Sequence, residues 1–318
     1  MKLIVQIPCL NEEKTLLETV KDIPRRIDGI DSVEILIIDD GSTDRTVAVA
    51  RELGVDHIVR NTGNKGLAIS FMNGLEACLR LGADIIVNTD GDNQYHGADI
   101  PKLVGPIMRK EADIVVGDRQ TDSIGHFSFT KKKLQKMGSR MVRLLSGTRV
   151  PDTVSGFRAF SRAAALQINV ISTYSYTVET LIQAGNKRLA ISSVPVGINP
   201  KTRESRLVKS IPRFMMYQMS TMVRMYTMFR PLRTFFMIGA VLILGALVPS
   251  GRFLYFYFLG KGGGHIQSLI LATILFITGF QVLIVGLLGD VISSNRKLIE
   301  EVLLRVKKIE LDEKKAKG

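Results

Sequence analysis

The sequence contains no tryptophan and only two cysteines, Cys9 and Cys78. Two cysteines are too few for the disulfide framework of a small secreted protein, so we expect a reducing compartment. No GxGxxG motif occurs, which argues against a dinucleotide-binding fold. The four histidines lack metal-ligand spacing, and no Ser/His/Asp or Cys/His pattern supports a catalytic nucleophile. The N-terminal MKLIVQIP has too short an apolar run for a cleaved targeting peptide, and we expect a first strand there.

The basic excess of the chain is local. The formal net charge is +13, yet residues 1–118 carry 13 basic and 20 acidic side chains. The excess comes from 119–149 and 201–233, each of which holds eight basic residues and one acidic residue. Because the second stretch leads into the most apolar part of the chain, we expect a negatively charged membrane surface as its partner, and no nucleic acid.

Two uncharged apolar runs, 234–251 and 266–289, follow this second basic stretch. A helix rises ~1.5 Å per residue and crosses a ~30 Å hydrocarbon layer in about 20 residues. The second run has that length, and the first reaches it by continuing to residue 259. We therefore predict a transmembrane hairpin, 234–289, with spans 234–259 and 266–289. The alternative is a buried helical hairpin in a soluble protein. Two apolar runs of this length would give such a hairpin no polar face for the solvent, which argues against this alternative.

The charges around the hairpin predict its orientation. Basic residues precede the first span, and Arg296 and Lys297 follow the second, whereas the connection 260–265 carries one lysine. The positive-inside rule then places both flanks in the cytoplasm. We expect an integral protein of the cell or inner membrane with a cytoplasmic N-terminal domain and both termini cytoplasmic. Residues 290–318 are expected to form a charged cytoplasmic C-terminal tail.

Residues 1–205 form the expected soluble domain, in which short apolar strands alternate with helical patterns. The expected strands are 3–7, 33–39, 57–60, 84–90, 113–118 and 191–198. This alternation predicts an α/β fold with a mostly parallel sheet. Ligands of such sheets bind at the carboxyl ends of the strands, where the acidic pairs Asp39–Asp40 and Asp90–Asp92 occur.

Two further segments are expected to lie at the membrane surface. In 131–147 apolar residues follow helical spacing while lysines and arginines occupy the other face, as in a basic amphipathic interfacial helix. In 206–233 methionine and aromatic residues dominate and lead directly into the first span, so we predict an interfacial helix, with ordinary core packing as the alternative. This helix could also pack against a copy of itself, which leaves a homo-oligomer open.

The pair Asp90 and Asp92, in NTDGDNQ, is the main candidate site. Two carboxylates spaced DxD at a strand end can share one divalent cation through hard oxygen ligands, and Mg²⁺ or Mn²⁺ held in this way can also bind a diphosphate. A solvated acidic turn contains the same residue types, so the residues around the pair must distinguish a metal site from a turn. Here the pair follows a strongly apolar strand within an α/β pattern.

Two other turns carry groups suited to a nucleotide. In IDDGSTDRT, Asp39 or Asp40 could accept hydrogen bonds from a ribose or a base edge, although a capped turn before a helix has the same pattern. In NTGNKGLAIS, a glycine-rich turn before a helix could present backbone N–H groups to phosphate, with Lys65 nearby. By itself this second segment reads as a turn.

Taken in order, PCLNEE, IDDGSTDRT, NKGLAIS, NTDGDNQYHGADIP, GDR and DTVSGFRAFSR resemble the motifs of family 2 inverting glycosyltransferases of the GT-A fold, over roughly the first 165 residues. With basic interfacial helices and a two-span hairpin after them, the chain resembles most the dolichyl-phosphate mannose synthase and bacterial polyprenyl-phosphate glycosyltransferase group. The resemblance implies a Rossmann-like GT-A domain that transfers a hexose with inversion. The implied donor is a nucleotide-diphosphate sugar of the GDP-mannose or UDP-glucose type, and the implied acceptor is a polyisoprenyl phosphate such as dolichyl or undecaprenyl phosphate.

The resemblance also implies roles for individual residues. On the donor side these are Pro8, Asn11, Glu12, Asp39 and Asp40 for the nucleotide, and Asp90, Asp92 and Gln94 for Mg²⁺ or Mn²⁺. On the acceptor side, Arg119 falls where the family holds phosphate, and Asp152 and Arg158 fall in its segment beside the reaction centre. Lys131, Lys132 and Lys133 stand where the family has a basic arginine pair, and Arg203, Glu204, Ser205 and Arg206 match its later GxSK segment without the glycine.

The acceptor chemistry decides what the site must do. A phosphate monoester has a second pKa of about 6, so a phosphate oxygen of the acceptor is already an anionic nucleophile at neutral pH. We expect the metal on Asp90 and Asp92 to neutralise the departing diphosphate, while Arg119 and the lysines at 131–133 hold the lipid phosphate for in-line attack. Asp152 is expected to orient the acceptor or to serve as a base, with a turn-capping aspartate as the alternative.

Two other functions remain open from the sequence. One is a membrane glycosyltransferase with a diacylglycerol or polysaccharide acceptor, although the QxxRW motif of processive polysaccharide synthases requires a tryptophan that this chain lacks. The other is a non-catalytic membrane scaffold that binds nucleotide sugar or anionic lipid. No residue decides between a uracil and a guanine donor.

Overall fold

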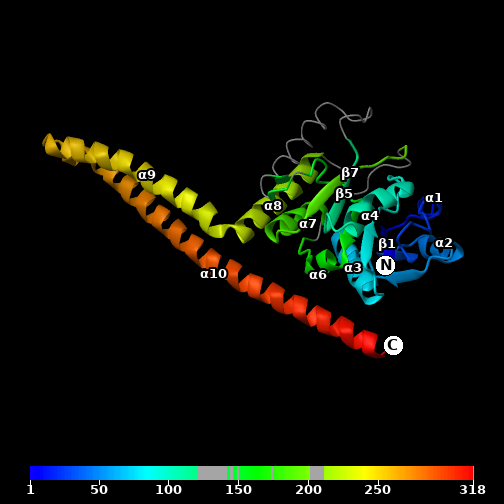
Figure 1. Cartoon of the computed structure of the whole chain (residues 1–318). Coiled ribbons are helices and arrows are strands. Elements are labelled where there is room, and N and C mark those ends of the chain that lie inside the picture. Colours follow the sequence, from blue (N-terminus) through cyan, green and yellow to red (C-terminus); the bar gives the residue numbers. More distant parts are fainter. Residues whose placement is uncertain (121–141, 144–145, 149, 173–174, 201–210, 318) are drawn as a thin grey trace. The chain divides into compact units, whose positions relative to one another are not determined.

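The computed structural model describes residues 1–318 except 121–141, 144–145, 149, 173–174, 201–210 and 318 (Figure 1). The chain divides into two compact units. The first comprises Met1–Met222 together with Leu304–Gly318, and the second is Val223–Leu303. Most of the basic helix predicted at 131–147 lies outside the described residues.

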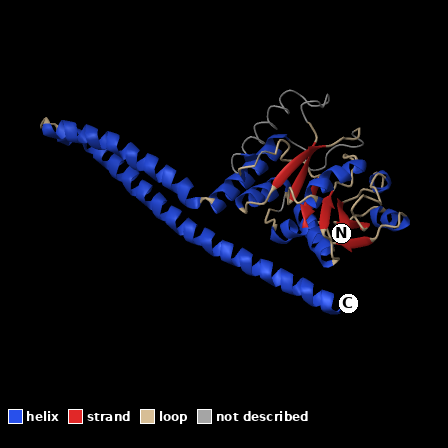
Figure 2. Ribbon diagram, viewed as in Figure 1, coloured by secondary structure: helices blue, strands red, loops and turns tan. Residues whose placement is uncertain are grey.

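The first unit is built on a sheet that has seven strands among the described residues, in the order β3-β2-β1-β4-β6-β5-β7 (Figure 2). The strands are β1 (Lys2–Cys9), β2 (Ser32–Asp39), β3 (His57–Arg60), β4 (Ile85–Asn88), β5 (Ile114–Asp118), β6 (Arg158–Ser161) and β7 (Ile191–Pro195). Neighbouring strands are parallel except where β6 pairs with β4 and β5. The structure therefore confirms the predicted α/β fold with a mostly parallel sheet.

Helices connect these strands and cover both faces of the sheet. They are α1 (Leu16–Lys21), α2 (Thr46–Glu52), α3 (Leu67–Arg80), the 3₁₀ turn η1 (Gly97–Asp99), α4 (Ile100–Met108), α6 (Arg162–Gln167) and α7 (Thr177–Asn186). Helix α8 (Ile211–Phe229) follows the last strand, β7. Helix α3 buries Phe71, Leu75 and Cys78, whose spacing places them on one face of a helix. That face meets the sheet where a Cβ on Gly74 would touch Gln6 and Ile38.

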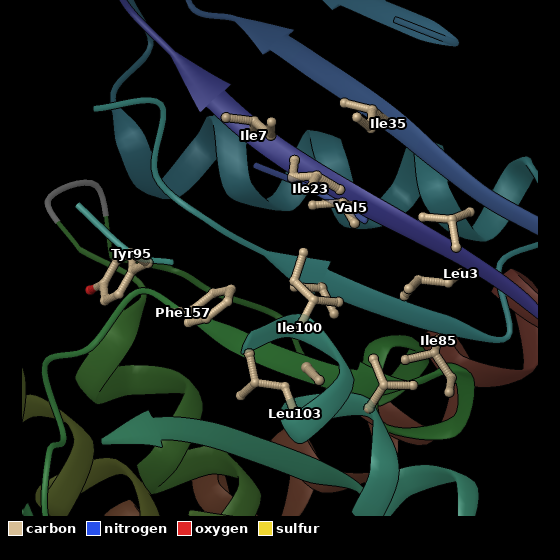
Figure 3. Close-up of a cluster of buried hydrophobic side chains, with 14 of the residues drawn as sticks. Leu3, Val5, Ile7, Ile23, Ile35, Ile85, Tyr95, Ile100, Leu103 and Phe157 are labelled. Carbon is tan, nitrogen blue, oxygen red and sulfur yellow. The ribbon is translucent and has the colours of Figure 1, made fainter. Parts of the chain in front are cut away.

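The other face of the sheet carries a cluster of buried apolar side chains (Figure 3). Alternate residues of β1, namely Leu3, Val5 and Ile7, point into it and are fully buried. Ile100 and Leu103 of α4 close the cluster from outside the sheet (Figure 3). Because helices cover both faces, the parallel strands β1, β2 and β4 are mostly apolar on both faces, as in other parallel sheets.

Strand β6 was not predicted, and it changes the arrangement around the site. It lies antiparallel between β4 and β5 and occupies part of the DTVSGFRAFSR segment. Its four residues include the polar Arg158 and Ser161, so no apolar run marks it in the sequence. The predicted strand 84–90 is also shorter than expected, because pairing stops at Asn88 and leaves Asp90 in the following loop.

The second unit consists mainly of two long helices. Helix α9 (Pro231–Phe258) is followed by the 3₁₀ turn η2 (Gly262–His265) and by α10 (Ile266–Lys317), whose end belongs to the first unit. Both helices are long and apolar enough to cross a membrane, and only 17% of the most apolar window of each is buried. Such exposure argues against the alternative of a buried core hairpin.

The predicted domain boundaries at 205, 233 and 289 stay predictions. Helix α8 spans most of the expected interfacial segment 206–233, and α9 begins directly after Arg230. The expected second span, 266–289, and the expected C-terminal tail, 290–318, belong to one continuous helix, α10, as far as Lys317. The location of residues 206–233 at the membrane surface also stays a prediction.

Candidate active site

Those predicted site residues that the structure describes lie at or near the carboxyl ends of the parallel strands, along one edge of the sheet. The parallel strands β1, β2, β4 and β5 all end at this edge, and β6 begins there because it runs in the opposite direction. Arg158, the first residue of β6, pairs with Asn88, the last residue of β4, and with Val116 of β5. The loops that follow β1, β2, β4 and β5 and the loop that precedes β6 therefore lie together.

The loops after β1 and β2 are joined by hydrogen bonds. Asn11 adopts a left-handed φ of 55°, which asparagine tolerates better than most residues. Its backbone N–H donates to Ser42 Oγ (2.9 Å), and its Oδ1 accepts from the Thr43 N–H (2.8 Å). The Glu12 N–H donates to Thr46 Oγ1 (2.8 Å). Asn11 and Glu12 are thus fixed against the segment that follows Asp39 and Asp40. Pro8, the third nucleotide-binding prediction here, lies in β1 opposite Ile38 of β2.

The two carboxylates at the end of β2 are buried and accept hydrogen bonds within the protein. The donors are Ser42 N–H (3.0 Å) and Arg60 Nε (3.1 Å) for Asp39, and Asn61 Nδ2 (2.8 Å), Lys65 N–H (2.9 Å) and Gly66 N–H (2.8 Å) for Asp40. Asp40 therefore fixes the glycine-rich turn that carries Lys65. Gly41, directly after Asp40, has a φ of 77°, and a Cβ there would lie 2.7 Å from the Gly63 backbone, so this contact requires glycine.

Asp90, Asp92 and Gln94 lie on the loop after β4 and are half-buried. Asp92 accepts a hydrogen bond from the Gln94 N–H at 3.2 Å. The loop is held from the β1 side, because Thr15 Oγ1 donates to the Gly91 carbonyl oxygen at 2.8 Å. The metal-binding and nucleotide-binding segments of the prediction are therefore neighbours in space.

The donor set of this loop fits a hard divalent cation. In the part of the chain that the structure describes, no group of three or more His, Cys, Asp or Glu side chains is placed to hold a metal on its own. Mg²⁺ is commonly bound by one or two carboxylates, with waters and substrate phosphates completing its octahedral shell. Asp90 and Asp92 can supply such oxygens, and a diphosphate would have to complete the shell.

Arg119 and Asp152 form a buried ion pair across the loops of β5 and β6. Arg119 Nε donates to Asp152 Oδ2 (2.6 Å) and Arg119 Nη2 to Asp152 Oδ1 (3.0 Å), and the side chains are 12% and 1% exposed. Burial by itself would lower the pKa of Arg119, but the nearby Tyr95 and Asp152 raise it above its usual value. Such bidentate geometry fixes the guanidinium plane. The predicted phosphate-binding arginine is therefore oriented by the predicted base.

Arg158 does not lie where a contact to the acceptor phosphate, its predicted role, would require. Its side chain is fully buried, and burial lowers its pKa to about 10. The guanidinium donates to the carbonyl oxygens of Thr153 (2.9 Å), Ser155 (2.8 Å) and Thr177 (2.7 Å) and to Thr180 Oγ1 (2.6 Å). A buried cation needs such partners. We therefore correct the prediction and assign Arg158 to holding the loop before β6 against α7.

Several predicted acceptor residues lie outside the described residues, namely Lys131, Lys132, Lys133, Arg203 and Arg206. Three residues that sequence reasoning missed lie beside the site instead. Asn88, Tyr95 and Tyr176 are buried around the loop before β6 and hydrogen-bond to Gly156. Asn88 and Tyr95 flank the DxD motif, but Tyr176 is 20 residues beyond Gly156, and no sequence signal links the two.

Known proteins resemble this chain in sequence and in fold. UDP-N-acetylglucosamine–dolichyl-phosphate N-acetylglucosaminyltransferase of Methanococcus voltae is 31% identical over 214 residues, which cover 60% of this chain and 82% of that protein. Polyprenol monophosphomannose synthase of Mycolicibacterium smegmatis is 26% identical over 204 residues, 61% of this chain and 76% of that protein. Glucosyl-3-phosphoglycerate synthase from Mycobacterium tuberculosis, crystallised with Mn²⁺, UDP and glucosyl-3-phosphoglycerate, matches with a TM-score of 0.57 at 23% identity, covering 70% of this chain and 79% of that one.

The fold likeness confirms the predicted GT-A architecture, and the sequence match identifies the family. The family model described as glycosyl transferase family 2 matches residues 4–168. This range contains the DxD loop, the Arg119–Asp152 pair, most of β1 and all of β2 to β6. The chain is a glycosyltransferase and belongs to glycosyl transferase family 2.

Proposed function

We propose that this glycosyltransferase transfers a hexose, with inversion, from a nucleotide-diphosphate sugar to the phosphate of a polyisoprenyl phosphate. The observation that carries the proposal is the meeting of an acidic loop and a buried arginine at one sheet edge. Asp90 and Asp92 lie on one side of that edge, and Arg119 lies on the other. This charge distribution suits two substrates that are both anionic. Relatives whose names specify dolichyl-phosphate and polyprenol-phosphate transfer support the choice of acceptor.

On the donor side, the chain's own residues bind and orient the nucleotide. The connected loops of Asn11, Glu12, Asp39 and Asp40 form the nucleotide site, with Lys65 on the turn that Asp40 fixes. Asp90 and Asp92, with Gln94, would hold Mg²⁺ or Mn²⁺. When bound, the ion would stabilise the negative charge of the departing diphosphate.

On the acceptor side, an oxygen of the lipid phosphate forms the new bond to C1 as the bond from C1 to the diphosphate oxygen breaks. The acceptor oxygen is already anionic, so no base is required. We assign Arg119 to holding the acceptor phosphate and Asp152 to orienting Arg119, because the oxygens of Asp152 accept both donated N–H groups. The lysines at 131–133, Arg203 and Arg206 would add positive charge.

The hairpin of α9 and α10 would place this reaction at a bilayer that also contains the acceptor. Two helices suited to crossing a membrane and a lipid substrate are mutually consistent. We propose that the catalytic domain and both termini are cytoplasmic. A homo-oligomer through the 206–233 segment stays a prediction.

The test is release of nucleoside diphosphate by the purified full chain in detergent. With Mn²⁺ and a panel of nucleotide sugars, release should require added polyprenyl phosphate, and a chelator should abolish it. Asp92→Asn should lower the rate at least ~100-fold, as loss of a metal ligand removes charge stabilisation. Asp31→Asn, which changes an exposed carboxylate, is the matched control and should keep the wild-type rate.

Three outcomes would contradict the proposal. Release that needs diacylglycerol or a polysaccharide in place of polyprenyl phosphate would support the other transferase. Nucleotide-sugar binding without release under any acceptor would support the scaffold. A fully active Asp92→Asn enzyme would exclude the assigned metal site.

A further inference from the structure

Gly156 lies directly against the carboxylate of Asp90. A Cβ built on Gly156 would be 2.9 Å from Asp90 Oδ2 and 3.0 Å from Asp90 Oδ1. Contacts this short are closer than carbon and oxygen tolerate without movement. Gly156 belongs to the loop before β6, and Asp90 belongs to the loop after β4. The position of one loop therefore limits where the carboxylate on the other can lie.

Both backbone polar groups of Gly156 are held by buried side chains. Its N–H donates to the Tyr95 hydroxyl oxygen at 3.0 Å. Its carbonyl oxygen accepts from Asn88 Nδ2 at 2.9 Å and from the Tyr176 hydroxyl at 3.2 Å. Asn88 and Tyr176 also bond to each other, with 2.7 Å between Nδ2 and the hydroxyl oxygen. The peptide groups on both sides of the Gly156 Cα are thus held by hydrogen bonds.

These holding groups are themselves rigidly placed. Asn88 and Tyr176 are fully buried, and Asn88 Oδ1 accepts from Gln6 Nε2 of the central strand β1 at 2.9 Å. The Tyr176 ring stacks on Phe71 of α3 with centroids 3.9 Å apart and planes 2° apart. Buried, fully bonded polar networks of this kind fix one conformation. The network thereby connects α3, β1, β4 and the N-terminal end of α7 to a single glycine.

We propose that Asn88 and Tyr176 are positioning residues that act through Gly156 to fix the carboxylate of Asp90 for divalent-metal binding. The inference rests on the proposed function, since it takes Asp90 to be a metal ligand. It extends that function to two side chains that are fully buried. Groups that orient metal ligands commonly change metal affinity about 10- to 100-fold when they are removed.

The test measures Mn²⁺ affinity by electron paramagnetic resonance on the full chain in detergent, with and without UDP or GDP, independently of sugar transfer. Tyr176→Phe removes only the hydroxyl and keeps the ring on Phe71. Gly156→Ala keeps the network and places a methyl group against Asp90. We expect each variant to bind Mn²⁺ with the nucleotide about 10- to 100-fold more weakly than the wild type. Circular dichroism should show that both variants remain folded at the temperature used.

Two control variants separate positioning from general loss of stability. Ser161→Ala removes the N-cap hydrogen bond to Ala164 at the other end of β6. Ile85→Val removes one methylene group from a fully buried side chain at the start of β4, the end of that strand away from Asp90. Both should lower the thermal midpoint and leave Mn²⁺ affinity within about twofold of the wild type.

The outcomes are distinguishable. If Asp92→Asn loses Mn²⁺ binding while Tyr176→Phe and Gly156→Ala retain wild-type affinity, the positioning inference is wrong and the proposed function stands. If Asp92→Asn itself binds Mn²⁺ as the wild type does, the metal site of the proposed function is wrong. If the two control variants weaken Mn²⁺ binding as much as Tyr176→Phe, the effect is one of stability, and the inference is overturned.

Discussion

The pair of Arg119 and Asp152 combines a structural constraint with a chemical function. Removing two charges from water is costly, and their attraction offsets that cost only when the geometry is good. Here both oxygens of Asp152 accept from Arg119, and the carboxylate is 1% exposed. The pair thereby fixes a cationic group at the sheet edge without leaving a buried carboxylate unpaired.

Breaking this pair from one side should be worse than removing both charges. We expect Arg119→Met to lower the free energy of unfolding by about 3–5 kcal/mol, because Asp152 would remain buried without its cation. The double variant Arg119→Met/Asp152→Asn should be more stable than Arg119→Met alone. Equilibrium unfolding by urea in detergent measures both. A double variant that is the less stable of the two would show that Asp152 is compensated by other groups.

Asp44 gives a pH dependence with a definite sign. Burial raises the pKa of this carboxyl. Hydrogen bonds from the Thr46 hydroxyl and from the N–H groups of Thr46 and Glu13 lower the pKa by more than burial raises it, so the net pKa is below its usual value. A group with a lowered folded-state pKa stabilises the fold at neutral pH and loses that contribution as the pH falls through the lowered value. Asp44 joins the loops of β1 and β2, so this stability belongs to the predicted nucleotide site.

The corresponding measurement is the thermal midpoint of wild type and Asp44→Asn between pH 7 and pH 3. We expect the variant to melt about 2–4 °C lower at pH 7, and the difference to shrink below about pH 4 as the wild-type carboxylate is protonated. Arg45→Gln changes the neighbouring exposed residue and should show no such convergence. A constant difference at every pH would mean that Asp44 acts by shape and not by charge.

The sequence predicted some of these residues and missed others for a physical reason. Asp90 and Asp92 were predictable as a candidate site because both carboxylates lie on one short loop after an apolar strand. Tyr176 was not, because its contact with Asn88 joins residues 88 positions apart and depends on how α7 packs against the sheet. Arg158 was misassigned because a motif shows that an arginine is present and does not show that its guanidinium points into the core.

At the level of elements, the antiparallel strand β6 explains how the loop with Asp152 reaches the loop with Asp90. A parallel strand at this place would start at the opposite edge of the sheet and carry its preceding loop away from Asp90. Because β6 runs the other way, the loop that contains Asp152 and Gly156 meets the loop after β4. The parallel strands were predictable from apolar runs, whereas four residues with two polar side chains gave no such signal.

The helices α9 and α10 pack where glycine allows close approach. A Cβ on Gly239 would lie 2.8 Å from the Gly279 carbonyl oxygen, and a Cβ on Gly279 would lie 2.9 Å from the Gly239 carbonyl oxygen. Without a hydrophobic force between helices in lipid, such close backbone contact is a main source of their association. The two glycines are therefore expected to determine how tightly the hairpin closes.

Gly239→Ala and Gly245→Ala make a matched test of this contact. Both add a methyl group to α9, but a Cβ on Gly245 meets nothing within 4 Å. We expect Gly239→Ala to destabilise the hairpin by about 1–3 kcal/mol, because backbone atoms must move apart. Gly245→Ala should be neutral or stabilising by up to about 1 kcal/mol, since alanine favours the helix. Unfolding in detergent compares the two, and equal effects would show that the Gly239 contact contributes nothing specific.

At the level of the whole molecule, the chain combines an α/β unit whose apolar side chains are mostly buried with a helical unit whose apolar side chains are mostly exposed. Val248 and Phe258 of α9 are 75% and 82% exposed, and Ile292 of α10 is 68% exposed. In water such surfaces would cause association, whereas hydrocarbon is a suitable solvent for them. Both candidate spans could be predicted from the sequence alone, because a membrane span is recognised by the length of an apolar run and its lack of charge.

The orientation of the hairpin can be measured with single cysteines, since Cys9 and Cys78 are buried and leave a low labelling background. Gly263 in the connection between the helices is exposed, and a Cβ there meets nothing within 4 Å. Asp312 near the end of α10 is also exposed. The positive-inside rule predicts that a membrane-impermeant maleimide labels Gly263→Cys in intact cells and labels Asp312→Cys only after permeabilisation. The reverse pattern would place the sheet edge and its Arg119–Asp152 pair on the side of the membrane opposite to a cytoplasmic nucleotide-sugar supply, and would contradict the proposed reaction there.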